Sequence, residues 1–244
     1  MPANPNVNLL AIDTATEHMA IGLETPGGRW LHNAPGGAQA SANLLSAVAD
    51  LLARAGIGYP GLSAIAFGQG PGAFTGLRTA CAVAQGLAFG VGKPVLAIDS
   101  LMVVAEDAHL QSGLTGSEAL CDWWVAVDAR MDEVYAAHFQ RRPDGWQVLA
   151  SAQLFSVAAL AQVWAAQPPV RVAGNACSVF ADRLPLARAQ CWPDQADRAA
   201  ALLNLARQAW LSGRTLAPAQ ALPVYVRDKV ALTTDERAAK ASAA

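Results

Sequence analysis

The chain has 244 residues, of which 53 % are hydrophobic and 15 % charged, and its formal net charge is −2. This composition is typical of a globular protein with a sizeable core, and it excludes a disordered chain and a protein that grips nucleic acid alone through clustered Lys and Arg. No apolar run reaches the ~18 residues of a membrane span. The first residues, MPANPNVN, lack a signal peptide's basic start and apolar centre, so we expect a cytoplasmic protein without membrane contact.

Strand and helix patterns alternate along the first half of the chain. In order, they predict a two-strand hairpin at 9–24, a helix at 41–55, a strand at 62–68, a second helix at 75–89 and a strand PVLAI ending near Asp99. Ser41 is the expected N-cap of the first helix, and Gly56 is its expected stop. The glycine-rich loop GQGPG joins the 62–68 strand to the second helix.

The second half of the chain repeats the first. WVAVDARMDEVYAAHF (124–139) aligns without gaps on LLAIDTATEHMAIGLE (9–24), which places Asp128 on Asp13, and VRVAGNACSVF later echoes SAIAFGQGPGAF. Two echoes in the same order favour a duplication, because a strand that turns sharply and re-enters a sheet needs the same turn chemistry both times. The sequence therefore predicts two related α/β lobes.

The predicted lobes occupy residues 1–104 and 105–193, and the second is the smaller. An amphipathic helix follows at 194–213 and is expected to pack back on the N-terminal lobe. Residues 214–244 form the C-terminal region. In it, ALPVYVRDKVAL is expected to add an edge strand, and TTDERAAKASAA is expected to be a frayed tail.

Two stretches are candidates for contact with nucleotide phosphate. Asp13 and Thr14 lie in the turn IDTAT, and in actin-like and sugar-kinase folds such a turn faces a nucleotide's phosphates or its metal ion. Ala15, however, takes the place of the usual glycine, and Asp13 could equally satisfy the turn's own backbone groups. Gly70 and Gly72 belong to a loop between a strand and a helix, where anions bind. This loop matches neither GxxxxGK[ST] nor GxGxxG, so a plain tight turn is the alternative.

The helix after this loop carries small residues at every fourth position: Gly76, Ala80, Ala84 and Ala88. Such a stripe lets a facing helix approach toward the lower end of the ~8–10 Å range of interaxial distances. Because a glycine costs roughly 1 kcal/mol in a helix interior, we expect the close approach to be needed. The facing helix is either the chain's own helix at 41–55 or a helix of a second protein.

Metal and nucleophile motifs are absent from the sequence. The histidines never lie three or four residues apart, and no CxxC, HExxH or GxSxG occurs. The four cysteines, Cys81, Cys121, Cys177 and Cys191, are therefore expected to be buried free thiols. We expect no metal site and no assembled catalytic triad.

Four motifs, in this order and spacing, resemble the bacterial TsaB (YeaZ) family: LLAIDTAT, AFGQGPGAFTGLRTACAVAQGLAFG, DARMDEVYAAHF and PVYVRDKVA. The resemblance spans about residues 9–232. It implies an α/β fold of the actin-like (ASKHA) type, with two duplicated lobes and mixed sheets flanked by helices. It also implies a non-catalytic subunit that binds and organises the catalytic paralogue TsaD, together with the small ATPase TsaE. Their complex forms N6-threonylcarbamoyladenosine next to the anticodon of tRNA.

The resemblance carries further expectations about sites and partners. TsaD's metal-binding histidine pair falls near Ser100 and Val104, which ligate metals poorly, so no catalytic residue and no cofactor of the isolated chain are expected. A nucleotide at the interface with TsaD stays open, and tRNA is expected to be met mainly through the complex. The helices after the first hairpin and after the glycine loop would contact TsaD, or a second copy when the chain is alone. The predicted interface residues are Leu44, Val48, Phe74, Gly76, Leu77, Thr79, Ala80, Val83, Ala84 and Leu87.

An enzyme is the alternative interpretation. It would be an actin-like ATPase or kinase that uses Asp13 and the loop at 68–72, and ATP binding by the isolated chain would favour it. A metalloprotease is a third interpretation, but the sequence contains no cluster of metal-ligating residues that supports it. Ala40 and Ser46 stand where relatives often carry His and Pro, which leaves open any contact made by that histidine.

Overall fold

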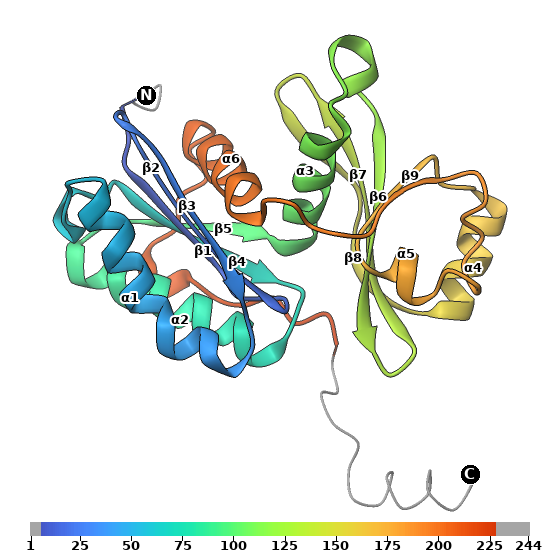
Figure 1. Ribbon diagram of the computed structural model, residues 1–244, viewed down its shortest axis with the longest axis horizontal. Helices are drawn as coiled ribbons and strands as arrows, with labels where there is room; N and C mark the ends of the chain where they lie inside the picture. The colour runs from blue at the N-terminus through green and yellow to red at the C-terminus, as the bar shows by residue number, and fades with distance from the viewer. Residues whose placement is uncertain (1–5, 228–244) are drawn as a thin grey trace, which may run out of the picture.

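The computed structural model describes residues 6–227, except for the side chains of residues 38–41. Two lobes lie side by side, and α3 (Ser100–Ser112) and α6 (Arg198–Leu211) stand between their sheets (Figure 1). Within the described part of the chain, no helix is long and apolar enough to cross a bilayer. The tail TTDERAAKASAA, expected to be frayed, lies outside the described residues.

The first lobe is built on a five-stranded sheet in the order β3-β2-β1-β4-β5. Its strands are β1 (Leu9–Asp13), β2 (His18–Thr25), β3 (Gly28–Pro35), β4 (Ala64–Gly70) and β5 (Val95–Asp99). The helices α1 (Ala38–Arg54) and α2 (Phe74–Val91) cover one face, and α6 covers the other. Leu10 and Ile12 of β1 pack in the core under α1 and α2, whereas Leu9 packs in the core under α6. Burial on both faces explains why β1 reads as an uninterrupted apolar run.

The second lobe repeats this sheet. Its strands are β6 (Asp122–Arg130), β7 (Glu133–Arg142), β8 (Gly145–Ser156), β9 (Arg171–Ala173) and β10 (Gln190–Trp192), in the order β10-β9-β6-β7-β8. Counted from the first strand of each lobe, both sheets have the same order and the same mixture of antiparallel and parallel pairs. The predicted duplicated α/β fold with mixed sheets is therefore confirmed.

Helices cover both faces of the second sheet as well. α3 packs on one face, and α4 (Val157–Ala166) and α5 (Ala176–Val179) pack on the other. α5 has 4 residues where the equivalent helix of the first lobe, α2, has 18. The expected boundary between the lobes at residue 104 falls inside α3. Short single-turn helices, η1 (Tyr59–Gly61), η2 (Gly116–Ala119) and η3 (Pro218–Gln220), lie in the connections.

Two local predictions are wrong. α1 begins at Ala38 with Gly37 as its N-cap, so Ser41 lies inside the helix instead of capping it. Gly37 has φ 78°, a left-handed conformation that glycine adopts at low cost, and the chain turns there from β3 into the helix. The expected edge strand is also not formed by residues 221–227, and the rest of ALPVYVRDKVAL lies outside the described residues. Pro223 has no N–H for a ladder, and the bridge to β5 comes from Leu216 instead.

The small-sided face of α2 packs mainly on the sheet, in a core that it shares with Leu44 and Val48 of α1, so the chain itself covers this face. Ala80, Ala84 and Ala88 are fully buried in one core with residues of β1, β2 and β4. Gly76 lies so close to the β1–β2 turn that a Cβ on it would be 1.8 Å from the Thr14 carbonyl oxygen. Small side chains thus let α2 sit close to the sheet, whose larger residues fill the core between them.

Candidate functional site

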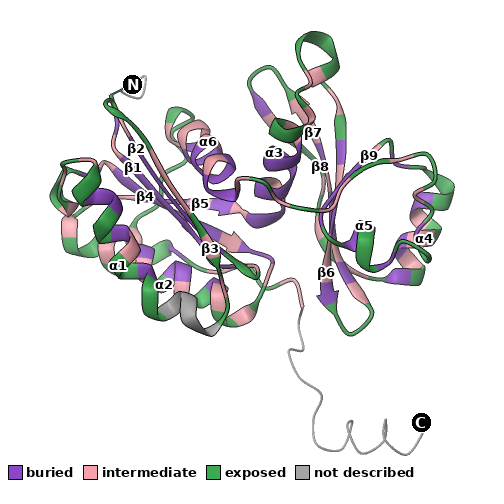
Figure 2. Cartoon of the chain, in the orientation of Figure 1, coloured by how far each residue is buried: buried purple, intermediate pink, exposed green. Residues whose placement is uncertain are grey.

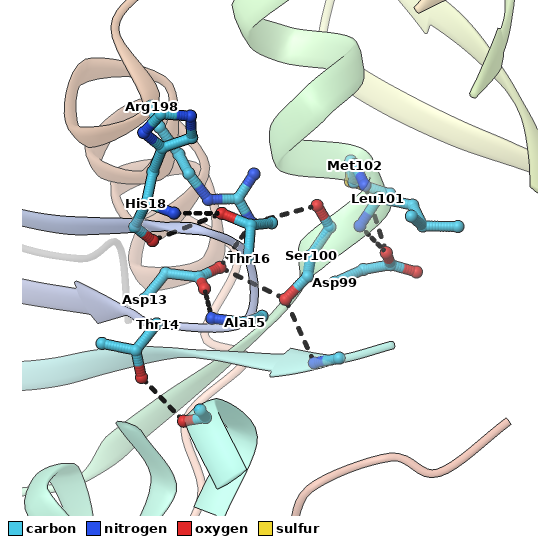
Figure 3. Close-up of polar contacts among 12 residues, drawn as sticks. Asp13, Thr14, Ala15, Thr16, His18, Asp99, Ser100, Leu101, Met102 and Arg198 are labelled. Atoms are coloured by element: carbon cyan, nitrogen blue, oxygen red, sulfur yellow. Dashed lines mark hydrogen bonds and ion pairs between the residues drawn. The ribbon is translucent and has the colours of Figure 1, made fainter. Parts of the chain in front are cut away.

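The turn after β1 is organised around the fully buried carboxylate of Asp13. One carboxylate oxygen, Oδ1, accepts a hydrogen bond from the Ala15 N–H at 2.6 Å. The other, Oδ2, accepts from the Ser100 hydroxyl at 3.2 Å and from the Arg198 guanidinium at 2.8 Å. Figure 3 shows these side chains converging from β1, α3 and α6. Asp13 therefore satisfies a backbone group of its own turn, as the alternative interpretation expected, and its carboxylate also binds the Arg198 cation.

Arg198 forms a buried ion pair with Asp13. The side chain of Arg198 is 2 % exposed and that of Asp13 0 %, and 185 residues separate them in sequence. A second guanidinium nitrogen of Arg198, Nη1, donates to the Gln195 amide oxygen at 2.6 Å. A buried carboxylate needs a positive partner, since an unpaired charge is very costly away from water. Here the chain supplies that partner itself, through Arg198.

The glycine loop packs on this turn. A Cβ on Gly68 would lie 2.1 Å from an Asp13 carboxylate oxygen, and a Cβ on Gly72 would lie 2.4 Å from the Ala15 carbonyl oxygen. Gly70 has φ 112° and donates its N–H to the Ser100 hydroxyl at 3.2 Å. The glycines are thus required by the close approach of the loop to the chain's own backbone and side chains.

The structure brings the four candidate nucleotide contacts together. Asp13 and Thr14 lie beside the loop that contains Gly70 and Gly72. Their polar groups, however, bind one another or nearby parts of the chain, and the Thr14 hydroxyl donates to the Gly76 carbonyl at 2.7 Å. Contact between a nucleotide and any of these four residues stays a prediction.

The second lobe has an equivalent turn after β6. Asp128 accepts a hydrogen bond from the Arg130 N–H at 2.8 Å, and its other carboxylate oxygen lies 3.2 Å from the Arg130 guanidinium. The same guanidinium pairs with Glu17 of the first lobe. Both acidic turns of the duplicated fold therefore carry an arginine on their carboxylate.

No described group of three or more His, Cys, Asp and Glu side chains is arranged to hold a metal ion. Ser100 donates its hydroxyl to Asp13, and Val104 is buried in an apolar core, so neither of these positions presents a ligand. All cysteines are free thiols, but the expectation that all are buried is wrong: Cys191 is exposed and Cys121 is half-buried.

Arg198 and the role of Ser100 were not predicted from the sequence. One signal for Arg198 was available, because DRAAALLNLARQAWL places an arginine at the start of a mostly apolar helix, directly before a run of apolar residues. An arginine in such a position needs a buried acid. The sequence could not identify Asp13 as that acid.

The predicted partner-interface residues fall into two groups. Leu44, Val48, Leu77, Ala80 and Ala84 are buried in the core of the first lobe. They therefore support the two helices from beneath and are not surface contacts of the chain in this conformation. The other five are half-buried: Phe74, Gly76, Thr79, Val83 and Leu87.

The outward faces of α1 and α2 consist mainly of small and apolar residues, and they lie side by side (Figure 2). The exposed residues of these faces include Ala42, Leu45, Ala49 and Ala53 on α1, and Ala82, Gly86, Phe89 and Gly90 on α2. Leu45 and Phe89 are the large ones, with 50 % and 59 % exposure. We call this surface the α1–α2 face.

Known proteins resemble this chain over most of its length. A family model described as "TsaD: tRNA N6-adenosine threonylcarbamoyltransferase" matches residues 31–229. The tRNA threonylcarbamoyladenosine biosynthesis protein TsaB of Escherichia coli is 31 % identical over 241 residues, 92 % of this chain and 96 % of that protein. The protein of the same name from Haemophilus influenzae is 31 % identical over 235 residues, 92 % of this chain and 95 % of that protein.

A solved structure agrees with these sequence relatives. YeaZ from Pseudomonas aeruginosa superposes with a TM-score of 0.79 and is 36 % identical, covering 90 % of this chain and 99 % of that one. The resemblance inferred from the four motifs is thereby confirmed by sequence and by fold. The chain belongs to the TsaB (YeaZ) family of tRNA threonylcarbamoyladenosine biosynthesis proteins.

Proposed function

We propose that the chain serves tRNA threonylcarbamoyladenosine biosynthesis as a non-catalytic subunit, which binds the catalytic paralogue TsaD through the α1–α2 face. Family membership supports the pathway. The composition of the α1–α2 face supports the mode of binding. In the absence of TsaD, the same face would join two copies of the chain. TsaE and tRNA would be met through the complex.

The observation that carries this proposal is the pair of outward glycines on α2. A Cβ on Gly86 or Gly90 would meet no atom within 4 Å, so packing inside the chain gives no reason for either glycine. Each costs roughly 1 kcal/mol relative to Ala in a helix interior. The exposed residues of the two helices are mainly small, and the large ones, Leu45 and Phe89, are apolar, so a partner helix could pack closely against them.

The buried site of the first lobe supports the non-catalytic part of the proposal. Asp13 and the glycine loop were the basis of the ATPase or kinase alternative. Arg198 and Ser100 already satisfy the Asp13 carboxylate, and the loop is in close contact with the β1–β2 turn. An ATP phosphate or its metal ion would have to displace this buried cation. A nucleotide at the boundary with TsaD stays a prediction.

Charge placed on the α1–α2 face tests the docking surface. Gly86→Arg and Ala82→Arg add a large cation to outward positions of α2, whereas Ala158→Arg adds the same group to an exposed position of α4 on the other lobe. We expect the two α2 variants to fold and to lose TsaD binding by at least about tenfold, since a buried unpaired charge at an interface is costly. Ala158→Arg should bind as the parent does. Unchanged affinity of both α2 variants in calorimetry, with parent-like thermal unfolding, would reject this face as the docking site.

Nucleotide titration separates the two functions. The proposal predicts no heat when ATP is added to the isolated chain, and it predicts that TsaD's transfer activity depends on the chain's presence. Tight ATP binding that Asp13→Ala abolishes would favour the enzyme instead. The same titration on the complex with TsaD would then detect a nucleotide held between the subunits.

A further inference from the structure

The turn between β6 and β7 is held in a strained conformation. Arg130, Met131 and Asp132 are successive residues with φ of 64°, 58° and 64°, and none of them is glycine. Left-handed backbone at a non-glycine residue is uncommon and unfavourable, so three in a row persist only if the surroundings enforce them. Met131 is 53 % exposed, so packing of its own side chain does not enforce the turn.

Arginines from distant parts of the chain enforce it. Arg183 binds the Asp132 carboxylate through two parallel hydrogen bonds of 2.6 and 2.8 Å. Arg227, whose side chain is 14 % exposed, donates through one nitrogen to the Ala129 carbonyl at 2.9 Å and to the Arg130 carbonyl at 3.3 Å. The same nitrogen pairs with the Glu133 carboxylate. The carbonyls of Ala129 and Arg130, at the turn end of β6, thus accept hydrogen bonds from the charged guanidinium of Arg227.

The residues just before Arg227 are bound to the other lobe. The Val224 N–H donates to the Gln69 carbonyl at 2.6 Å, at the end of β4. The Tyr225 ring lies 5.2 Å from the Phe74 ring, and its hydroxyl accepts a hydrogen bond from Arg78 Nε at 3.0 Å. The Arg78 guanidinium also lies 3.8 Å from the Phe74 ring centroid, close enough for a cation–π contact. Tyr225 is therefore fixed to the start of α2.

We propose that residues 224–227 form a clasp, which sets the angle between the lobes and holds the β6–β7 turn in its strained form. The clasp joins three motifs of the sequence that share no secondary structure: the start of GAFTGLR, the turn DARMDE and the segment VYVR. Figure 1 shows the segment reaching from the first lobe into the space between the lobes. This device is independent of the α1–α2 face and of what binds there.

The clasp has two ends, and each end has a variant. Arg227→Gln removes the cation from the second-lobe end, and Tyr225→Leu removes the hydroxyl and the aromatic contact from the first-lobe end. Arg188→Gln, at an exposed position, is the matched control for charge removal. Spin labels introduced as non-natural amino acids at Ala49 of α1 and Ala158 of α4 report the distance between the lobes by pulsed electron resonance.

We expect both clasp variants to broaden the distribution of interlobe distances, and the control to leave it unchanged. Arg227→Gln should also speed hydrogen exchange of the amides at 129–133 by about tenfold, because the turn then opens more often. Tyr225→Leu, which leaves the turn's own contacts in place, should affect exchange less. Distance distributions of both variants that superpose on the parent's would overturn the clasp. Should Arg227→Gln fail to fold, Tyr225→Leu alone decides the question.

Discussion

Two glycines of α2 allow a direct test of how this helix is used. Gly76→Ala would place a Cβ 1.8 Å from the Thr14 carbonyl oxygen and 2.8 Å from its carbonyl carbon. Both are backbone atoms of the β1–β2 turn, so they cannot swing away as the end of a flexible side chain would. Gly86→Ala adds the same methyl group to the same helix, where it meets no atom within 4 Å. The two variants therefore differ in environment and hardly at all in chemistry.

The structure predicts that the two substitutions change the free energy of unfolding in opposite directions. Forcing a methyl group into a packed site costs about 1–3 kcal/mol. Separating helix and turn would also weaken the 2.7 Å hydrogen bond from the Thr14 hydroxyl to the Gly76 carbonyl, which is worth about 1 kcal/mol. We therefore expect Gly76→Ala to lower the free energy of unfolding by about 2–4 kcal/mol. Gly86→Ala should raise it by about 0.5–1 kcal/mol, because alanine loses less backbone entropy in a helix.

Thermal unfolding followed by circular dichroism measures both effects. For a chain of this size, 1 kcal/mol corresponds to about 2–4 °C in Tm, so the two variants should be separated by several degrees on opposite sides of the parent. Gly76→Ala with a Tm equal to or above the parent's would refute the close contact between α2 and the β1–β2 turn. A Gly86→Ala variant that is less stable than the parent would show that the outward face of α2 is packed within the chain.

Other side chains give measurable outcomes. Arg198→Met leaves the Asp13 carboxylate buried without its cation, so the free energy of unfolding should fall by about 3–5 kcal/mol in a urea titration, and a loss below about 1 kcal/mol would contradict the buried pair. Exposed Cys191 should react with a thiol reagent before Cys177, because burial raises the pKa of the Cys177 thiol; mass spectrometry of partly labelled protein checks the order. Burial lowers the pKa of His138, so the unfolded chain takes up that proton at a higher pH than the folded chain. The stability that this histidine contributes should be complete above about pH 6.5 and fall as the pH drops toward the folded pKa, a slope that His138→Gln should reduce.

The central strands and the duplication could be predicted because their burial leaves a clear pattern of apolar residues in the sequence. β1 is buried along its whole length, and its hairpin with β2 recurs as β6 and β7 with the same acidic turn. The missed elements lack such a pattern. β3 and β8 are edge strands with mostly half-buried or exposed residues, and Val148 and Leu149 of β8 are exposed, so apolar and polar residues do not alternate regularly along them. α3 is buried on most of its circumference, from Leu101 to Ala108, between the two sheets (Figure 2). A helix buried on all sides has no amphipathic period to detect.

The site was only partly predictable for a similar reason. The sequence indicated Asp13 and the glycine loop as separate candidates, and the structure shows that they meet because both follow strands that pair with each other. The cation that meets them, Arg198, comes from the far end of the chain, and residue spacing holds no information on that contact. Gly76 and Gly86 show the same limit within one helix, because periodicity identifies a face but not what covers it. The β1–β2 turn covers the first glycine, and nothing in the described chain covers the second.

The two acidic turns of the duplicated fold are each satisfied within the chain. In each lobe the carboxylate at the end of the first strand is neutralised by an arginine of the same chain, Arg198 for Asp13 and Arg130 for Asp128. Arg130 also reaches Glu17, so one guanidinium satisfies its own turn and ties the lobes together. A turn whose charges are already paired keeps its geometry without a ligand, because no bound ion is needed to offset desolvation. The exposed glycines of α2 then remain as the feature that internal packing does not explain.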